Sequence, residues 1–91
     1  MSITGVYILR SLKNGSYYIG STVDISRRIF YHNNGWVKAT KNNRPFELAR
    51  FIPCADLSEA RKNEYHFKRY KRRDIIDKVI KDGIFPWNAG G

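Results

Sequence analysis

Glu64 stands at a position where an amphipathic helix would bury an apolar side chain. The segment 56–70, DLSEARKNEYHFKRY, reads as a helix, and helical spacing puts four of its residues on one stripe: Leu57, Ala60, Glu64 and Phe67. A dry, charged and unpaired carboxylate costs on the order of several kcal/mol, so Glu64 requires a nearby Arg, a Lys or a metal ion. Together with two tyrosines, an arginine and a histidine earlier in the chain, this carboxylate suggests a phosphodiester-cleaving site.

Phosphodiester hydrolysis makes three demands that these side chains can meet. It needs an activated water, stabilisation of the negative charge that grows around phosphorus, and help for the leaving oxygen. The Glu64 carboxylate suits one Mg²⁺ or Mn²⁺ ion that retains several waters. Arg28 and His32 lie one helical turn apart and therefore face the same way. Arg28 can fork onto phosphate oxygens, and His32 can orient a tyrosine or assist proton transfer.

Three strands and three helices are expected to position these residues. Runs of β-branched and aromatic residues predict strands at 3–11, 17–21 and 46–52. Capping residues and apolar periodicity predict helices from Asp24 to about Asn33, over 56–70 and over 74–81. The order β-β-α-β-α-α is typical of an α+β domain in which a three-stranded antiparallel sheet is flanked by helices.

The length of 91 residues suffices for one domain and not for two. We expect a core over about 3–81 and a C-terminal tail over 82–91, whose two bulky aromatics dock part of it on the body. Asn14-Gly15 is the favoured pair for a two-residue hairpin loop between the first two strands. Such a loop puts Tyr7 and Tyr18 on the same face of the sheet, whereas a one-residue slip would separate them.

The charge of the chain favours a polyanionic partner. Its formal net charge is +9, from 17 Lys and Arg against 8 Asp and Glu, and the segment 61–81 holds nine basic and three acidic residues. So basic a small domain usually meets nucleic acid, which we favour over a merely solvated surface and over an anionic membrane. The expected DNA contacts, besides Thr40, are Gly20, Ser21, Thr22, Lys38, Lys41, Arg44, Lys68, Arg69, Lys71, Arg72 and Arg73.

Cysteine content and hydropathy bear on compartment. Cys54 is the one cysteine, so neither an intrachain disulfide nor a Cys-based zinc site can form. The sequence shows neither a signal peptide nor a transmembrane stretch. We therefore expect a soluble cytoplasmic protein without a disulfide partner.

Two tripeptides and three single residues give the chain a family resemblance. In chain order these are Gly5-Val6-Tyr7, Tyr18-Ile19-Gly20, Arg28, His32 and Glu64. Their order and spacing resemble the pattern of the GIY-YIG nuclease superfamily. Val6 replaces the isoleucine of the first tripeptide. The resemblance covers about residues 5–67 and is closest to the small stand-alone members, which are similar to the nuclease domain of an excision-repair endonuclease.

The resemblance implies a magnesium- or manganese-dependent DNA endonuclease, a hydrolase of the kind found in DNA repair. It implies that Tyr7, Tyr18, Arg28, His32 and Glu64 form the catalytic set, with Glu64 as the metal ligand. One of the two tyrosines would relay a proton from the attacking water, and we favour Tyr18. Several members carry a Lys at the position of Ser21, so a second cation beside the phosphate is missing here.

Other interpretations stay open at this point. The chain could be a non-catalytic nucleic-acid-binding module on the same fold, and Glu64 could pair with Arg61 or Lys68 on a solvated helix face. Trp36 and Trp87 could be base-stacking platforms, although packing is favoured. The small size favours structure-directed or weakly specific cleavage of DNA, with RNA as an alternative and with the oligomeric state and protein partners undetermined.

Overall fold

The central strand of the sheet, β1 (Gly5–Ser11), pairs with a neighbour along each edge. The computed structural model describes residues 3–70 and 72–88. In it β1 lies between β2 (Tyr17–Thr22) and β3 (Phe46–Pro53), and both pairings are antiparallel. The predicted three-stranded antiparallel sheet and the order β-β-α-β-α-α are confirmed.

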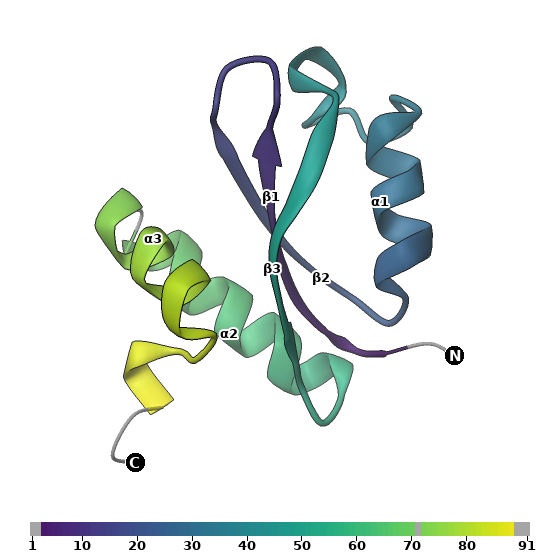
Figure 1. Ribbon diagram of the computed structural model, residues 1–91. Helices are drawn as coiled ribbons and strands as arrows, with labels where there is room; N and C mark the ends of the chain where they lie inside the picture. The colour runs from purple at the N-terminus through teal and green to yellow at the C-terminus, as the bar shows by residue number, and fades with distance from the viewer. Residues whose placement is uncertain (1–2, 71, 89–91) are drawn as a thin grey trace.

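Side chains of β1 alternate between two hydrophobic layers. Val6 and Ile8 point into one layer, and Tyr7 and Leu9 point into the other; all four are buried. Figure 1 shows helices on both sides of the sheet. A strand with both faces covered explains why the segment 5–9 is apolar almost without interruption.

The helix α1 (Ile25–Asn33) begins and ends at the residues that its sequence predicts. The Asp24 side chain accepts a hydrogen bond from the backbone N–H of Arg27 and so caps the first turn. Gly35, just beyond the last turn, has φ of +75°, which a residue without a Cβ adopts at little cost. Ile25 and Ile29 pack on the layer that contains Tyr7 and Leu9, so α1 covers that face.

The other face is covered by α2 (Leu57–Tyr70) and α3 (Arg73–Asp82). Asp56 caps α2 by accepting from the N–H of Glu59. The two helices project on the side of the sheet away from α1 (Figure 1).

The C-terminal segment docks on α2, as its aromatics predicted. The Trp87 ring lies 5.1 Å from the Phe67 and Phe85 rings, and its Nε1–H donates to Asn63 Oδ1 at 2.8 Å. Trp87 is therefore a packing residue, which confirms that interpretation for one of the two tryptophans. This segment includes the short 3-10 helix η2 (Pro86–Asn88).

The β1–β2 hairpin has a longer loop than its Asn-Gly pair predicted. Ser11 N–H donates to Ser16 O, and Leu12–Gly15 form a four-residue loop with Gly15 at φ of +76°. The prediction of a two-residue turn was wrong. The observed loop is longer than the predicted one by two residues, an even number, so each side chain stays on its predicted face of the sheet. Tyr7 and Tyr18 therefore still share one face.

Gly20 lies directly opposite Tyr7 in the β1–β2 ladder. A Cβ built on Gly20 would lie 2.3 Å from the Tyr7 hydroxyl oxygen and 2.5 Å from its ring. Gly20 had been expected to contact DNA, which would need open space at this position. The structure shows that the Tyr7 ring fills this space.

Gly20→Ala should lower the free energy of unfolding by about 1–3 kcal/mol, because the new methyl group forces the Tyr7 ring aside. The cost should shrink in a Tyr7→Leu background, where no ring lies across the position. Urea denaturation of the single and double variants measures both values. Equal costs in the two backgrounds would contradict the contact.

Candidate active site

The Tyr7 hydroxyl connects the two helical residues expected to act together. It lies 3.0 Å from His32 Nε2 and accepts a hydrogen bond from Arg28 Nε at 3.3 Å. Tyr7 is 1% exposed, so the polar end of a core side chain finds both of its partners on α1. The structure therefore brings together Tyr7, Arg28 and His32. Helical spacing predicted that Arg28 and His32 face the same way, and the family resemblance implied that Tyr7 joins them.

His32 is fully buried and is held from its other side by Thr40. Its Nδ1 lies 2.7 Å from Thr40 Oγ1, and that hydroxyl donates to Val37 O. The network then assigns the proton of the imidazole to Nδ1 and leaves Nε2 to accept from Tyr7. Burial, and secondarily the charge of Arg28, lower the pKa of His32 to about 4, so the ring is neutral at physiological pH.

Thr40 is the residue of this network whose role the sequence did not reveal. It had been counted with the loop cations as a contact to the nucleic-acid backbone, and this was wrong because the residue is 1% exposed. Nothing in the polar loop 36–44 marks one threonine as buried. Only the closure of the loop over His32 makes it so.

The charges of the other two members follow from the same contacts. Burial raises the pKa of the Tyr7 phenol, outweighing the hydrogen bond from Arg28 that lowers it. The hydrogen bond to Tyr7 raises the pKa of Arg28. Near neutral pH, Tyr7 is thus a neutral phenol and Arg28 is a cation tethered through Nε. Among residues 3–70 and 72–88, nothing forms a hydrogen bond with its two terminal amino groups, which can therefore bind another ligand.

Tyr18 lies beside this network and differs from Tyr7 in exposure. Its ring centroid is 5.0 Å from that of His32 and 6.3 Å from that of Tyr7, and the residue is only partly buried. Its hydroxyl has no hydrogen-bond partner within the described ranges 3–70 and 72–88. Of the two tyrosines, Tyr18 is therefore the one whose phenol can meet solvent or a ligand.

Glu64 reaches the same end of the sheet from the opposite face. Its Oε1 accepts from Ser21 Oγ at 2.7 Å, and its Oε2 accepts from Lys68 Nζ at 2.5 Å. Ser21 follows Gly20 in the edge strand β2, and Gly20 is the residue paired with Tyr7. The negative charge of Glu64 contributes to raising the pKa of Tyr7, although the two side chains do not contact each other directly.

The burial of Glu64 differs from the sequence expectation. The buried residues of α2 are Ala60, Asn63 and Phe67, so Asn63 takes the central position of the stripe. Glu64 lies at its flank with 20% of its side chain exposed. The pairing with Lys68 that the alternative foresaw does form, but the carboxylate also turns toward β2 and contacts Ser21.

The oxygen donors around Glu64 suit a hard cation bound through few protein ligands. Within residues 3–70 and 72–88, no group of three or more His, Cys, Asp or Glu side chains is placed to hold a metal. One carboxylate with a neighbouring hydroxyl fits Mg²⁺ or Mn²⁺, which keep most of their waters. Such an ion would compete with Lys68 for the carboxylate.

The expected DNA-contacting residues divide by their contacts. Lys38, Lys41, Arg44 and Arg69 are exposed. Arg72 binds Asp74, the guanidinium of Arg73 lies over the Tyr17 ring, and Thr22 forms a turn with Asp24. Lys71 lies outside the described residues. The loop after α1 thus carries three exposed cations.

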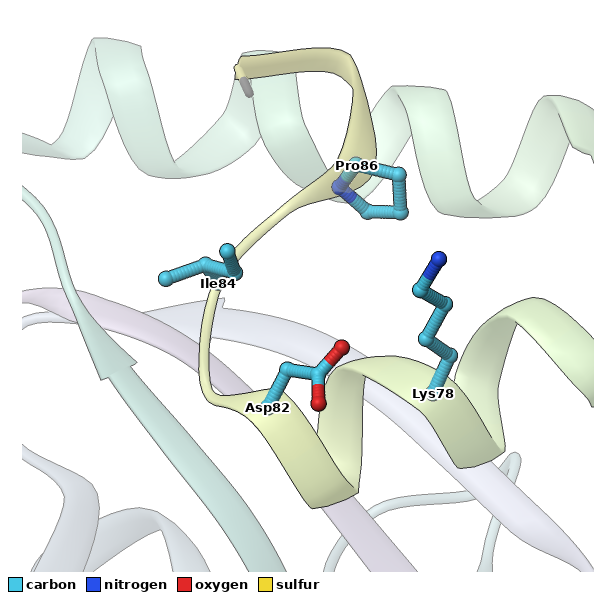
Figure 2. A pocket seen from close by; sticks show the side chains of 4 residues that line it. All are labelled: Lys78, Asp82, Ile84 and Pro86. Carbon is cyan, nitrogen blue, oxygen red and sulfur yellow. The ribbon is translucent and has the colours of Figure 1, made fainter. Parts of the chain in front are cut away.

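A hollow near the C-terminus holds none of these residues. Lys78, Asp82, Ile84 and Pro86 line it, from α3 and the segment that follows. Figure 2 shows Lys78 and Asp82 projecting from α3 below Pro86 and Ile84. Its lining has only two ionisable side chains, one cation and one carboxylate. The cluster around Tyr7 is therefore the better candidate for a catalytic site.

The helices of the described part also bear on membrane insertion. In residues 3–70 and 72–88, none of them has both the length and the apolar character that crossing a bilayer demands.

Comparison with known proteins identifies relatives over most of the chain. The model of the GIY-YIG catalytic domain matches residues 3–77. A UPF0213 protein of Staphylococcus epidermidis is 40% identical over 79 residues, which cover 86% of this chain and 94% of the relative. UPF0213 proteins of Listeria welshimeri (41% identity; 82% and 83% covered) and Desulfotalea psychrophila (39%; 87% and 74%) are similar. No solved structure matches the chain.

The depressed pKa of His32 predicts how stability varies with pH. The unfolded chain takes up a proton on this residue near pH 6.5, whereas the folded chain does so only near pH 4. The free energy of unfolding should therefore fall as the pH drops from 6.5 to 4, by up to about 1.4 kcal/mol per pH unit more than in His32→Gln.

Urea denaturation over this pH range measures the two slopes. His66→Gln is the matched control, because it removes the other imidazole of the chain from a position outside the cluster. Identical slopes in the wild type and His32→Gln would show that His32 is not buried in its neutral form.

Proposed function

The chain belongs to the GIY-YIG family, and we propose that it is a divalent-metal-dependent endonuclease that hydrolyses phosphodiester bonds in DNA. The observation that carries the proposal is the tethering of Arg28 through Nε to a buried tyrosine. This contact fixes a cation near the partly buried Tyr18, and a carboxylate lies at the neighbouring strand edge. We propose a single catalytic domain over 1–91, with the site at this end of the sheet.

Arg28 binds the phosphate in this mechanism. Its terminal amino groups carry N–H donors in the planar fork that matches two phosphate oxygens. Because Nε is already held by Tyr7, little side-chain entropy is lost when the fork binds. The guanidinium then stabilises the negative charge that grows on these oxygens in the transition state.

Tyr18 relays a proton from the attacking water, because its hydroxyl accepts that proton while it gives its own to solvent, and Tyr7 acts as a positioning residue. The Tyr7 phenol is buried, neutral and committed to Arg28 and His32, so it cannot approach a water in the site. Tyr18 is only partly buried, and its ring packs at a tilt against the neutral imidazole of His32.

Glu64 would hold the divalent ion, with the Ser21 hydroxyl beside it. When bound, such an ion polarises a phosphate oxygen and lowers the pKa of a coordinated water. Glu64 also attracts Lys68, whose ammonium group is close enough to contact a phosphate once it leaves the carboxylate. Lys68 thus supplies a cation near Ser21, where other members of the family carry a lysine.

The charge of +9 and the accessible cations support nucleic acid as the substrate. We propose DNA that is recognised by its structure or with weak sequence preference. A domain of this size has little room for further elements that read bases. A function in DNA repair and a location in the cytoplasm stay predictions from the sequence.

Glu64→Gln and Arg28→Ala should each reduce cleavage by about 100-fold or more, because each removes a group that interacts with the transition-state charge. Nicking of supercoiled plasmid in Mg²⁺, in Mn²⁺ and in EDTA measures the rates. Glu47→Gln, which alters an exposed carboxylate of β3, is the control and should keep wild-type activity. Metal-dependent nicking at the wild-type rate in both site variants would refute the assignment.

A wild-type protein that binds DNA tightly but never cleaves it would instead favour the non-catalytic module.

In either case the accessible loop cations should set the salt dependence of binding. Lys38→Ala/Lys41→Ala should weaken DNA binding and reduce the slope of log Kd against log salt by roughly 2, one for each phosphate contact. The double variant Lys78→Ala/Lys81→Ala on α3 is the charge-matched control. An unchanged slope in the loop variant would place the DNA elsewhere.

A further inference from the structure

Three aromatic rings form an exposed cluster at the end of α1. Trp36 lies against Phe30 and Tyr31, with centroid distances of 5.5 and 5.3 Å. Trp36 is 65% exposed and Phe30 is 55% exposed, and neither belongs to a hydrophobic layer of the sheet. The sequence had favoured packing for both tryptophans, and for Trp36 this was wrong. Phe30, Tyr31 and Trp36 are called the aromatic platform below.

The platform is held in place by polar contacts around Tyr31. The backbone N–H of Trp36 donates to Tyr31 O at 3.0 Å, which ties the loop back to the helix. Arg27 Nε donates to the Tyr31 hydroxyl at 2.6 Å, and its guanidinium lies 5.4 Å from the ring centroid. An exposed indole that is fixed by its neighbours loses little conformational entropy when a flat ligand covers it.

Arginine side chains lie beside the platform, and the sequence around it is basic. The sequence has no Asp or Glu between Asp24 and Glu47, and this stretch holds five Lys and Arg residues: Arg27, Arg28, Lys38, Lys41 and Arg44. The Arg44 guanidinium packs against Gly35, next to Trp36, where a Cβ would lie 2.2 Å from Nη1. A second copy of so basic a patch would be repelled, whereas a polyanion with flat rings would be attracted.

The platform and the candidate active site share one helix. Arg28 and His32 face the sheet, and Phe30 and Tyr31 lie farther around the same turns of α1. Tyr31 follows Arg28 by three residues, which is about 4.5 Å along the helix axis. Arg28 and the platform residues Phe30 and Tyr31 thus belong to one helix, so a single DNA strand that runs along α1 can contact both.

We propose that the aromatic platform stacks unpaired bases, so that the preferred substrate is DNA with a single-stranded arm beside a duplex. Exposed aromatics among cations are the usual means of binding single strands without reading their sequence. The inference rests on the proposed function for its nucleic-acid substrate. It adds which form of that substrate is bound.

Binding of three DNAs in EDTA tests the proposal without turnover. They are a blunt duplex, the same duplex with a single-stranded arm, and the same duplex with an arm of abasic sites, which keeps the charge of the arm and lacks its bases. The Trp87→Phe variant serves as the parent, because Trp36 is then the sole source of tryptophan fluorescence. Trp36→Ala and Tyr65→Ala are compared by fluorescence anisotropy of labelled DNA; Tyr65 is an equally exposed aromatic on α2.

The base-bearing arm should strengthen binding by about tenfold over the blunt duplex and should quench the emission of Trp36. The abasic arm should do neither. Trp36→Ala should bind the base-bearing arm no more tightly than the blunt duplex, and its affinity for the blunt duplex should be unchanged. Trp36→Phe should keep part of the extra affinity for the base-bearing arm, and Tyr65→Ala should keep all of it.

A gain that survives in Trp36→Ala, or that is equal for the abasic arm, would overturn this inference and leave the proposed function standing. Self-association of the parent that Trp36→Ala abolishes, with no preference for arms, would overturn it in favour of a contact between copies. Failure to bind any of the three DNAs would overturn the proposed function as well.

Discussion

A phenol buried in the middle of a sheet must find hydrogen-bond partners there, and at Tyr7 both partners come from one helix. Gly20 leaves the space for its ring, α1 supplies Arg28 and His32, and the loop after α1 closes over His32 through Thr40. Each part is ordinary by itself. Together they fix a guanidinium in one orientation, and its free donors are what a phosphate needs.

The carboxylate is held separately from this network, on the other face of the sheet. Glu64 reaches the end of β2 through Ser21 and is balanced by Lys68. Because the two halves of the site belong to different layers, a substrate phosphate at the strand edge would be the group that joins them. This division explains how the site is well ordered around Tyr7 while Glu64 remains partly accessible to an ion.

Much of this arrangement can be predicted from two regularities of the sequence, the alternation of side chains along a strand and the 3.6-residue repeat of a helix. A hairpin loop of two residues and one of four residues both leave Tyr7 and Tyr18 on the same face of the sheet. The shared face was therefore predicted correctly although the predicted loop length was wrong. Helical spacing correctly predicted that Arg28 and His32 face the same way. It wrongly placed Glu64 at the centre of the buried stripe of α2, where the structure has Asn63. The Asn63 amide oxygen accepts a hydrogen bond from Trp87, which is far away in the sequence. The burial of Thr40 and the exposure of Trp36 depend on how the loop closes, which no local pattern encodes.

In the proposed mechanism, one phosphate is held between the Arg28 guanidinium and an ion on the Glu64 carboxylate. Anomalous diffraction from crystals of the protein with Mn²⁺ and a non-cleavable DNA would reveal this arrangement. We expect a manganese peak at the Glu64 carboxylate and a backbone phosphate that contacts both the ion and the terminal amino groups of Arg28. Manganese bound elsewhere, or a phosphate at the ion with Arg28 turned away, would refute the mechanism.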